Sequence, residues 1–363
     1  MDFSLKAAIQ RLIFLFALFA GLYFAKPFLV PVAFGALLAM LLLPVALRLE
    51  KKMNRALAVL LCIAGLILIL SGIIALLSWQ VSDMAGNAAK MEQQVMQMIN
   101  TVKQQISTSL GISPQKQQQM LQQQQQSGGG GLSGGITHFL QSFVGMLGNF
   151  VLVLVYIFLF LYFRNRLKGF ILRKTKTENQ ESVRDMIDKS QEVAGKYISG
   201  LALMIVCLWV LYGIGFTIAG VKGALFFAIL CGLLEIIPFI GNITGTAITI
   251  LGVVAQGGGP EMIIAVAVTY AIVQTFQSYV LEPLIVGANV NINPLFTIMV
   301  IVLGELLWGV PGMILAIPLL AIAKIICDHV PELQPYGYLF GEDRKKGNTQ
   351  WVDKIKGWFG RKS

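Results

Sequence analysis

Acidic and amide side chains that could carry chemistry are concentrated in the last third of the chain, inside segments that are otherwise apolar. Glu235, Glu282 and Glu305 are the carboxylates, and Gln274 and Gln277 share one helical face. An acidic side chain near the middle of a bilayer costs about 2.5–3.5 kcal/mol on insertion scales. We therefore expect each carboxylate to face a cavity or a partner. Ion or proton coupling is one hypothesis for them, and a structural pair or an interface position is the other.

Proline and glycine interrupt two of the apolar runs. The run at 222–255 is broken at 237–242 by Ile-Pro-Phe-Ile-Gly-Asn, and the run at 294–327 is broken at 308–312 by Trp-Gly-Val-Pro-Gly, with Pro318 further on. Proline removes a backbone donor and clashes with the preceding turn, so these helices must kink or unwind. Non-helical backbone at membrane depth is tolerated only where it is buried in protein or lines a cavity. We expect both breaks to line a hydrated chamber, as in secondary transporters, although kinking for packing alone is the alternative.

The candidate positions for a solute or ion pathway are the polar side chains, prolines and glycines at or near the two breaks. An asparagine-rich segment, Val-Gly-Ala-Asn-Val-Asn-Ile-Asn-Pro, joins the two regions. The full set is Glu235, Pro238, Gly241, Asn242, Gln274, Gln277, Glu282, Pro283, Gly287, Asn289, Asn293, Pro294, Glu305, Gly309, Pro311, Gly312 and Pro318.

Composition places most of the surface in lipid. Hydrophobic residues make up 56% of the 363 residues, and charged residues only 13%, whereas soluble proteins carry roughly a quarter charged residues. The net charge of +10 is concentrated at 48–55, 164–196 and 344–362, between or after apolar runs. This is the positive-inside pattern of a membrane protein. It predicts the lipid bilayer as partner and no nucleic acid.

The sequence therefore predicts an all-α polytopic protein of the bacterial cytoplasmic (inner) membrane. A span needs about 20 apolar residues, which gives about eight hydrophobic segments. They are 8–26 (read as an uncleaved first span), 28–47, 56–79, 137–163, 199–219, 222–255, 260–281 and 294–327. Eight crossings place both termini in the cytoplasm. Re-entrant hairpins are the alternative for the two broken runs.

Six regions follow from this reading. They are N-terminal transmembrane helices (1–79), an extracytoplasmic amphipathic helix with a Gln/Gly spacer (80–136), a transmembrane helix (137–163), a cytoplasmic amphipathic segment (164–198), a transmembrane core with broken helices (199–330) and a basic cytoplasmic tail (331–363). Apolar residues from Val81 to Val102 form a heptad seam, which fits packing on the same chain or on a neighbouring subunit, with the subunit contact slightly favoured. The helical pattern at 183–198 fits an amphipathic helix lying along the membrane, or a plain connector.

No motif indicates an enzyme. The chain has no GxxxxGK[ST] loop, HExxH or GxSxG sequence. The four cysteines, Cys62, Cys207, Cys231 and Cys327, lie within or beside apolar runs and form no CxxC pair, so we interpret them as packing residues. We predict no cofactor and no metal. Uphill transport would have to draw on an ion, proton or solute gradient.

Four motifs resemble the autoinducer-2 exporter family of bacterial permeases. They are Glu-Ile-Ile-Pro-Phe-Ile-Gly-Asn-Ile-Thr-Gly from Glu235, Tyr-Val-Leu-Glu-Pro-Leu-Ile-Val-Gly from Tyr279, Asn-Ile-Asn-Pro-Leu-Phe from Asn291 and Leu-Trp-Gly-Val-Pro-Gly-Met-Ile-Leu-Ala-Ile-Pro from Leu307. The resemblance is specific over about 195–330, and the layout of spans matches along nearly the whole chain.

The resemblance implies an oligomeric inner-membrane protein that moves a small solute without hydrolysing ATP. Some members are linked to autoinducer-2 export in quorum sensing, and others to exchange of sodium or lithium for protons. Transport roles carry over to Pro238, Gly241, Pro283, Gly287, Pro294, Gly309, Gly312 and Pro318. Many members have acidic residues where this chain has Gln277 and Ser278, which puts cation coupling in doubt here.

Three functional hypotheses follow. The leading one is a secondary permease that exports a small polar solute or signal such as autoinducer-2. The second is a monovalent cation/proton antiporter that uses Glu282 or Glu305. The third, of another class, is a membrane scaffold that assembles through the external seam and transports nothing; it gives no reason for the two helix breaks.

Overall fold

The computed structural model describes residues 5–85, 132–238, 240–286 and 292–342. Within these ranges the chain is helical, with one isolated bridge between Ile292 and Gly341. The helices are α1 (Leu5–Phe24), α2 (Lys26–Glu50), α3 (Arg55–Ala85), α6 (Leu132–Lys174), η1 (Thr177–Asn179), α7 (Gln180–Ile218), α8 (Ala224–Leu234), α9 (Ile240–Ala255), α10 (Pro260–Phe276), η2 (Gln277–Val286), α11 (Pro294–Trp308), α12 (Val310–His329), η3 (Pro331–Leu333) and α13 (Gln334–Phe340).

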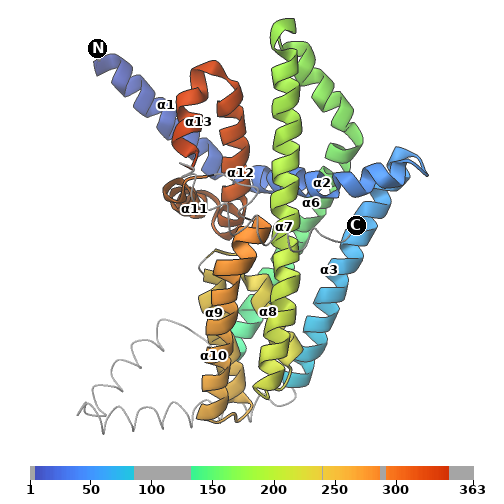
Figure 1. The fold of residues 1–363 in the computed structure, drawn as a ribbon, viewed down its shortest axis with the longest axis vertical. Coiled ribbons are helices and arrows are strands. Elements are labelled where there is room, and N and C mark those ends of the chain that lie inside the picture. The colour runs from blue at the N-terminus through green and yellow to red at the C-terminus, as the bar shows by residue number, and fades with distance from the viewer. Residues whose placement is uncertain (1–4, 86–131, 239, 287–291, 343–363) are drawn as a thin grey trace, which may run out of the picture.

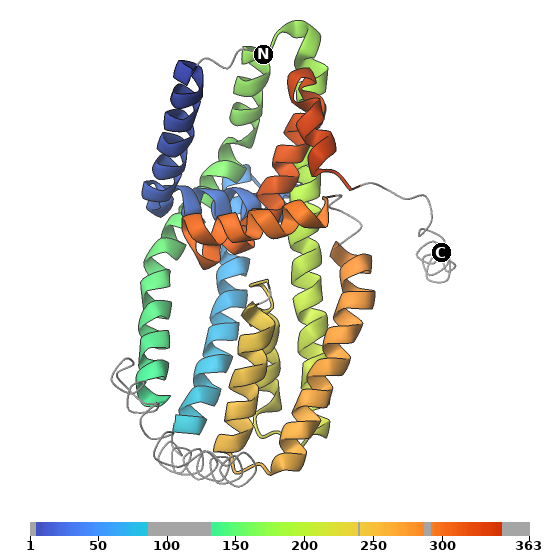
Figure 2. The same cartoon turned by 90° about the vertical axis from the view of Figure 1, so that its left-hand side faces the viewer.

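The long helix α7 is the axis of the molecule (Figure 1). The lower part of α7 packs against α8 and α10, and α3, α6 and α9 belong to the same bundle, whereas α2 and α11 run across it (Figures 1 and 2). Six helical segments of the described chain are long and apolar enough to span a bilayer. Large apolar side chains such as Leu68 and Ile69 are 72% and 63% exposed. The prediction of an all-α polytopic membrane protein is confirmed.

The core of the lower bundle is aromatic. Tyr212, Phe216 and Tyr270 form a cluster of rings, with centroids 4.8 to 5.7 Å apart. Tyr212 and Phe216 on α7 are fully buried, as is Phe227 on α8 to within 1%. Contacts between such large side chains hold α7, α8 and α10 together.

The broken run at 222–255 forms a hairpin that returns to its starting end. The backbone N–H of Lys222 donates to Gln256 Oε1 at 3.1 Å, and Gln256 Nε2 donates to the Lys222 carbonyl at 2.9 Å. This pair ties the start of α8 to the end of α9. The hairpin that the sequence left open as an alternative is therefore the arrangement found, and the run does not cross the bundle as one span.

The second broken run also folds back on itself. Gly309 has φ +67, a conformation that favours glycine, and it joins α11 to α12. Beyond this turn the two helices pack closely, because a Cβ at Gly304 would lie 2.5 Å from the Gly312 carbonyl oxygen. The start of α11 is also joined to the end of α13, because the Asn293 N–H donates to the Phe340 carbonyl at 2.9 Å.

The amphipathic segment at 183–198 is not a separate helix. It is the first half of α7, which continues without interruption into the predicted span at 199–219 (Figure 1). The change from an amphipathic to an apolar pattern contains no proline, so nothing in the sequence stops the helix. The interpretation as a separate surface helix is therefore wrong.

Several predictions fall where the structure gives no description. The heptad seam beyond Ala85, the Gln/Gly spacer up to residue 131 and the tail after Glu342 lie outside the described residues. The subunit contact predicted for the seam stays a prediction.

Candidate functional site

Glu235 lies at the tip of the first hairpin, directly after α8. Its Oε2 accepts a long hydrogen bond from Gln277 Nε2 at 3.5 Å. Gln277 is 3% exposed and begins η2, a π-helical continuation of α10. The structure thus brings together two of the predicted pathway residues that are 42 positions apart in the sequence.

Four side-chain oxygens, on α7, just after α8, on α10 and at the start of η2, are buried without a hydrogen-bond partner in the described chain. They are Tyr212 Oη, Glu235 Oε1, Gln274 Oε1 and Gln277 Oε1. A buried polar atom without a partner costs about 1–3 kcal/mol. Such atoms are rare in folded proteins and call for a functional explanation. We name these four residues the polar cluster.

Glu282 adds a second carboxylate beside the polar cluster. Its side chain is exposed. Glu282 and Pro283 lie within η2, and π-helical turns are frequent at functional sites because they widen a helix locally. The negative charge of this region therefore comes from the hairpin tip and from η2.

A second polar group lies within the aromatic core. The Cys231 thiol is within hydrogen-bonding distance of the hydroxyls of Thr249 and Tyr270. Sequence reasoning treated Cys231 as a packing residue and did not select Tyr212, Thr249 or Tyr270. Tyrosine and threonine are common in apolar helices, so no pattern in one sequence would have marked them.

Glu305 does not join the polar cluster. It is exposed on α11, and its side chain makes no hydrogen bond or ion pair with the residues that the structure describes. Only its backbone takes part in local structure, by accepting from the Gly309 N–H at 2.7 Å. Coupling through Glu305 therefore gains no support from this geometry.

The tips of the two hairpins pack against each other. Ile237, in the first break, contacts a cluster formed by Ile301, Met313 and Ala316 of the second hairpin. Gly241 lies directly against the backbone of Leu234, leaving no room for a side chain. The first break is therefore lined by packed side chains, and the hydrated chamber stays a prediction.

The other predicted positions serve local structure. Asn242 accepts from the Thr246 hydroxyl through its backbone carbonyl, and Pro238 lies in the turn before α9. Asn293 caps α11 by accepting from the Leu295 N–H at 2.9 Å, and Pro294 is the first residue of that helix.

In the second hairpin, Pro311 and Gly312 lie in the first turn of α12, next to Gly309. Pro318 is buried inside α12 and does not end it. Gly287 and Asn289 lie outside the described residues.

The polar cluster can accept hydrogen bonds or coordinate a cation. Carboxylate, amide and hydroxyl oxygens are acceptors, and they are also the ligands that hard cations prefer. In the described part of the chain, no group of three or more His, Cys, Asp or Glu side chains could hold a metal ion.

The described chain combines buried oxygens without partners beside a helix break with an apolar exterior. By class, the chain is an all-α multi-pass membrane protein. The family model described as AI-2E family transporter matches residues 12–332. The chain belongs to the AI-2E transporter family.

Similar proteins carry provisional names of the same kind. YrrI of Bacillus subtilis, provisionally named a transport protein, is 30% identical over 135 residues, which is 37% of this chain and 38% of YrrI. YueF of the same organism, with the same kind of name, is 27% identical over 201 residues, or 53% of each chain. PerM of Escherichia coli, provisionally named a permease, is 27% identical over 177 residues, or 46% of this chain and 50% of PerM. The matches therefore span about half or less of each relative.

Proposed function

We propose that the chain is a secondary permease of the bacterial inner membrane that exports a small polar solute, of the autoinducer-2 type, through the polar cluster. The observation that carries this proposal is the set of four buried oxygens without partners. A solute with several hydroxyl groups, such as the autoinducer-2 furanone, would donate hydrogen bonds to them. The solute would then supply the missing bonds that the empty protein lacks.

In this proposal the hairpin tip is the moving part. Glu235 and Gln277 are joined by a long hydrogen bond of 3.5 Å. Because this bond is long, little free energy is needed to break it. Separation of the hairpin tip from η2 would open the polar cluster toward one side of the bilayer, as alternating access requires.

Transport in proteoliposomes tests the proposal. The purified full chain is reconstituted, and uptake of labelled autoinducer-2 is measured against empty liposomes. Glu235→Gln should lower flux about tenfold or more, because hydrogen bonds to a charged group are worth about 1.5–3 kcal/mol. Glu332→Gln, an exposed carboxylate in η3, is the matched control and should keep full flux. Equal flux in Glu235→Gln and Glu332→Gln would exclude this site.

Exchange of a monovalent cation for protons is the second candidate. It is favoured by the two carboxylates, Glu235 and Glu282, and by the acceptor-only oxygens around them. A pH-sensitive dye inside the same proteoliposomes would report proton movement when sodium or lithium is added. Proton movement that is lost in both Glu235→Gln and Glu282→Gln would favour exchange over export.

A further inference from the structure

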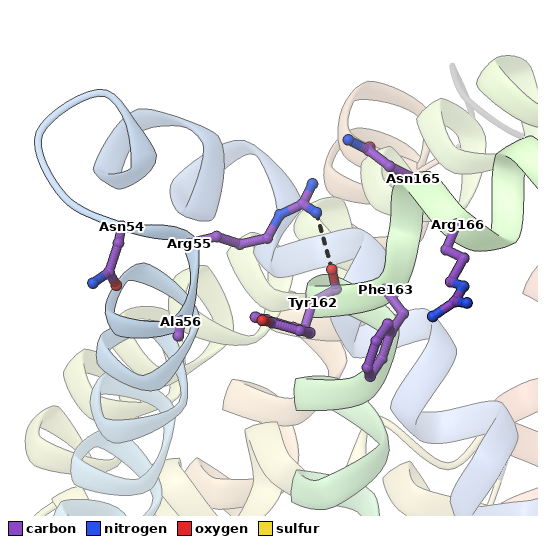
Figure 3. A pocket seen from close by; sticks show the side chains of 7 residues that line it. All are labelled: Asn54, Arg55, Ala56, Tyr162, Phe163, Asn165 and Arg166. Carbon is purple, nitrogen blue, oxygen red and sulfur yellow. Dashed lines mark hydrogen bonds between the residues drawn. The ribbon is translucent and has the colours of Figure 1, made fainter.

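A basic surface cleft lies where α3 and α6 change from apolar to charged residues. The cleft has a volume of about 530 Å³, and Figure 3 shows the side chains that line it. Its polar lining comes from the start of α3 and from α6, and consists of Asn54, Arg55, Asn165 and Arg166. Tyr162 and Phe163 form its aromatic edge. It lies apart from the polar cluster, which belongs to α7, α8 and α10.

Positive charge is in excess around the cleft. Glu50 is the carboxylate nearest to it, and Arg164 binds both of its oxygens, at 2.6 and 2.5 Å. Arg55 Nε lies 3.6 Å from the same carboxylate, and its Nη1 donates to the Tyr162 carbonyl at 3.0 Å. Arg166 makes no hydrogen bond or ion pair with the described residues. Glu50 therefore pairs with Arg164 and Arg55, and the Arg166 guanidinium has no acidic partner in the described chain.

The cleft has a charged side and an apolar side. No charged residue occurs on α6 between Phe150 and Phe163, whereas five basic residues follow between Arg164 and Lys174. On the apolar side, Leu57, Leu60 and Leu61 of α3 are each about half exposed, as is Val155 of α6. A ligand with an anionic head and long apolar tails would place its head in the cleft and its tails along this face.

We propose that this cleft binds the headgroup of an anionic glycerophospholipid, with the phosphate at Arg166, whose guanidinium has no partner in the described chain. Guanidinium groups bind phosphate through paired, charge-assisted hydrogen bonds. Arg55 is already positioned by the Tyr162 carbonyl, and Asn54 and Asn165 can donate to a glycerol headgroup. Tyrosine and phenylalanine at the edge are typical of the membrane interface. The positive-inside pattern of the sequence assigns this cleft to the cytoplasmic leaflet, where anionic lipids are concentrated.

Lipid retention measured by native mass spectrometry tests the site. The full chain is delipidated in detergent and titrated with phosphatidylglycerol or with phosphatidylcholine of the same acyl chains. We expect the unmodified chain to prefer phosphatidylglycerol. Arg166→Gln should weaken that binding about fivefold, since one basic residue contributes about 1 kcal/mol. Arg173→Gln removes the same charge from an exposed position on α6 outside the cleft, and it should leave binding unchanged.

Three results would overturn the proposal. Equal retention of the two lipids by the unmodified chain would show no headgroup preference. An equal loss in Arg173→Gln and Arg166→Gln would show diffuse attraction instead of a site. Displacement of phosphatidylglycerol by millimolar inorganic phosphate would assign the cleft to a free anion. Because Arg166 contacts nothing that holds the fold, its variant should keep the melting temperature of the unmodified chain in phosphatidylcholine, which separates lost binding from misfolding.

Discussion

At the scale of single residues, the Tyr212 hydroxyl distinguishes a structural role from a transport role. It is buried on α7 without a partner in the described chain, so it costs stability in the empty protein. Tyr212→Phe removes that cost while keeping the ring, which stacks on Phe216. We expect an unchanged or higher melting temperature. If the solute forms a hydrogen bond with this hydroxyl, the KM for transport should rise about 2- to 12-fold, because one lost hydrogen bond is worth about 0.5–1.5 kcal/mol.

Tyr279→Phe is the matched control for this change. Tyr279 lies in η2 and is 80% exposed, so its hydroxyl is outside the polar cluster whether or not a solute is bound. Neither the melting temperature nor the KM should move. An unchanged KM in Tyr212→Phe would remove this residue from the polar cluster's role in transport.

The ion pair of Glu50 with Arg164 predicts a pH dependence of stability. This pair lies in the basic region outside the apolar spans, and its hydrogen bonds hold the pKa of the Glu50 carboxyl below its ordinary value of 4.5. A lowered folded-state pKa means that the stabilisation is fully present above about pH 4.5 and is lost as the pH falls through the folded-state value. Melting temperatures between pH 7 and pH 3.5 should therefore fall at the acid end.

Arg164→Gln should lower the melting temperature at pH 7, by an amount equivalent to about 1–2 kcal/mol, and flatten the acid-dependent part of the curve. Lys174→Gln, at the exposed end of α6, should leave the curve unchanged. If Arg164→Gln kept the full acid dependence, other carboxyl groups would be responsible for it.

At the scale of elements, the tight turn of the first hairpin depends on Gly241. A Cβ there would overlap the Leu234 carbonyl group, and backbone cannot move aside as a flexible side chain can. Gly241→Ala should destabilise the protein by about 2–4 kcal/mol and lower the yield of folded protein in detergent. The measurement is thermal unfolding followed by size-exclusion chromatography.

Gly65→Ala is the control for the glycine substitution. Gly65 lies on α3, where an added Cβ would meet no atom within 4 Å, and alanine favours helix by up to about 1 kcal/mol. It should be neutral or slightly stabilising. Equal behaviour of the two variants would mean that the hairpin tip is looser than this structure shows.

The sequence could locate the helix breaks but not the direction of the chain after them. Proline and glycine at 237–242 and 308–312 mark the interruptions, because these residues are incompatible with a continuous helix. Whether the chain then continues or turns back depends on contacts such as Lys222 with Gln256, which join residues 34 apart. A broken span and a hairpin of the same sequence have the same hydropathy, so hydropathy does not distinguish them.

Some residues of the candidate site could be predicted from the sequence, and others could not. Glu235 and Gln277 stood out because polar side chains are costly in apolar segments, and the structure places them together. Glu305 stood out for the same reason, yet it is exposed on α11. The free-energy cost of a polar side chain in an apolar segment does not show which residue it will contact. Tyr212 could not be selected from the sequence, because a tyrosine ring is common in an apolar helix.

At the scale of the whole molecule, the hairpin changes how the chain is threaded through the membrane. The α8–α9 unit starts and ends beside the lower end of α7, and α10 then runs upward along it (Figure 2). If this end of the bundle lies outside, α7 and α10 cross the membrane in opposite directions with the hairpin between them. A single crossing of the run at 222–255 would instead put its two ends on opposite sides.

Cysteine labelling decides between these two arrangements. Lys222→Cys and Gly259→Cys are introduced singly in a chain whose four cysteines are replaced by alanine, and a membrane-impermeant maleimide is applied to right-side-out and to everted vesicles. The Lys222 backbone, not its side chain, makes the bonds to Gln256, and a Cβ at Gly259 would meet no atom within 4 Å. Both changes should therefore leave the fold intact.

We expect both cysteines to be labelled from the same side of the membrane, and Arg173→Cys from the opposite side. Labelling of Lys222→Cys and Gly259→Cys from opposite sides would show that the run crosses the bilayer once, because no hairpin can separate its own two ends across a membrane.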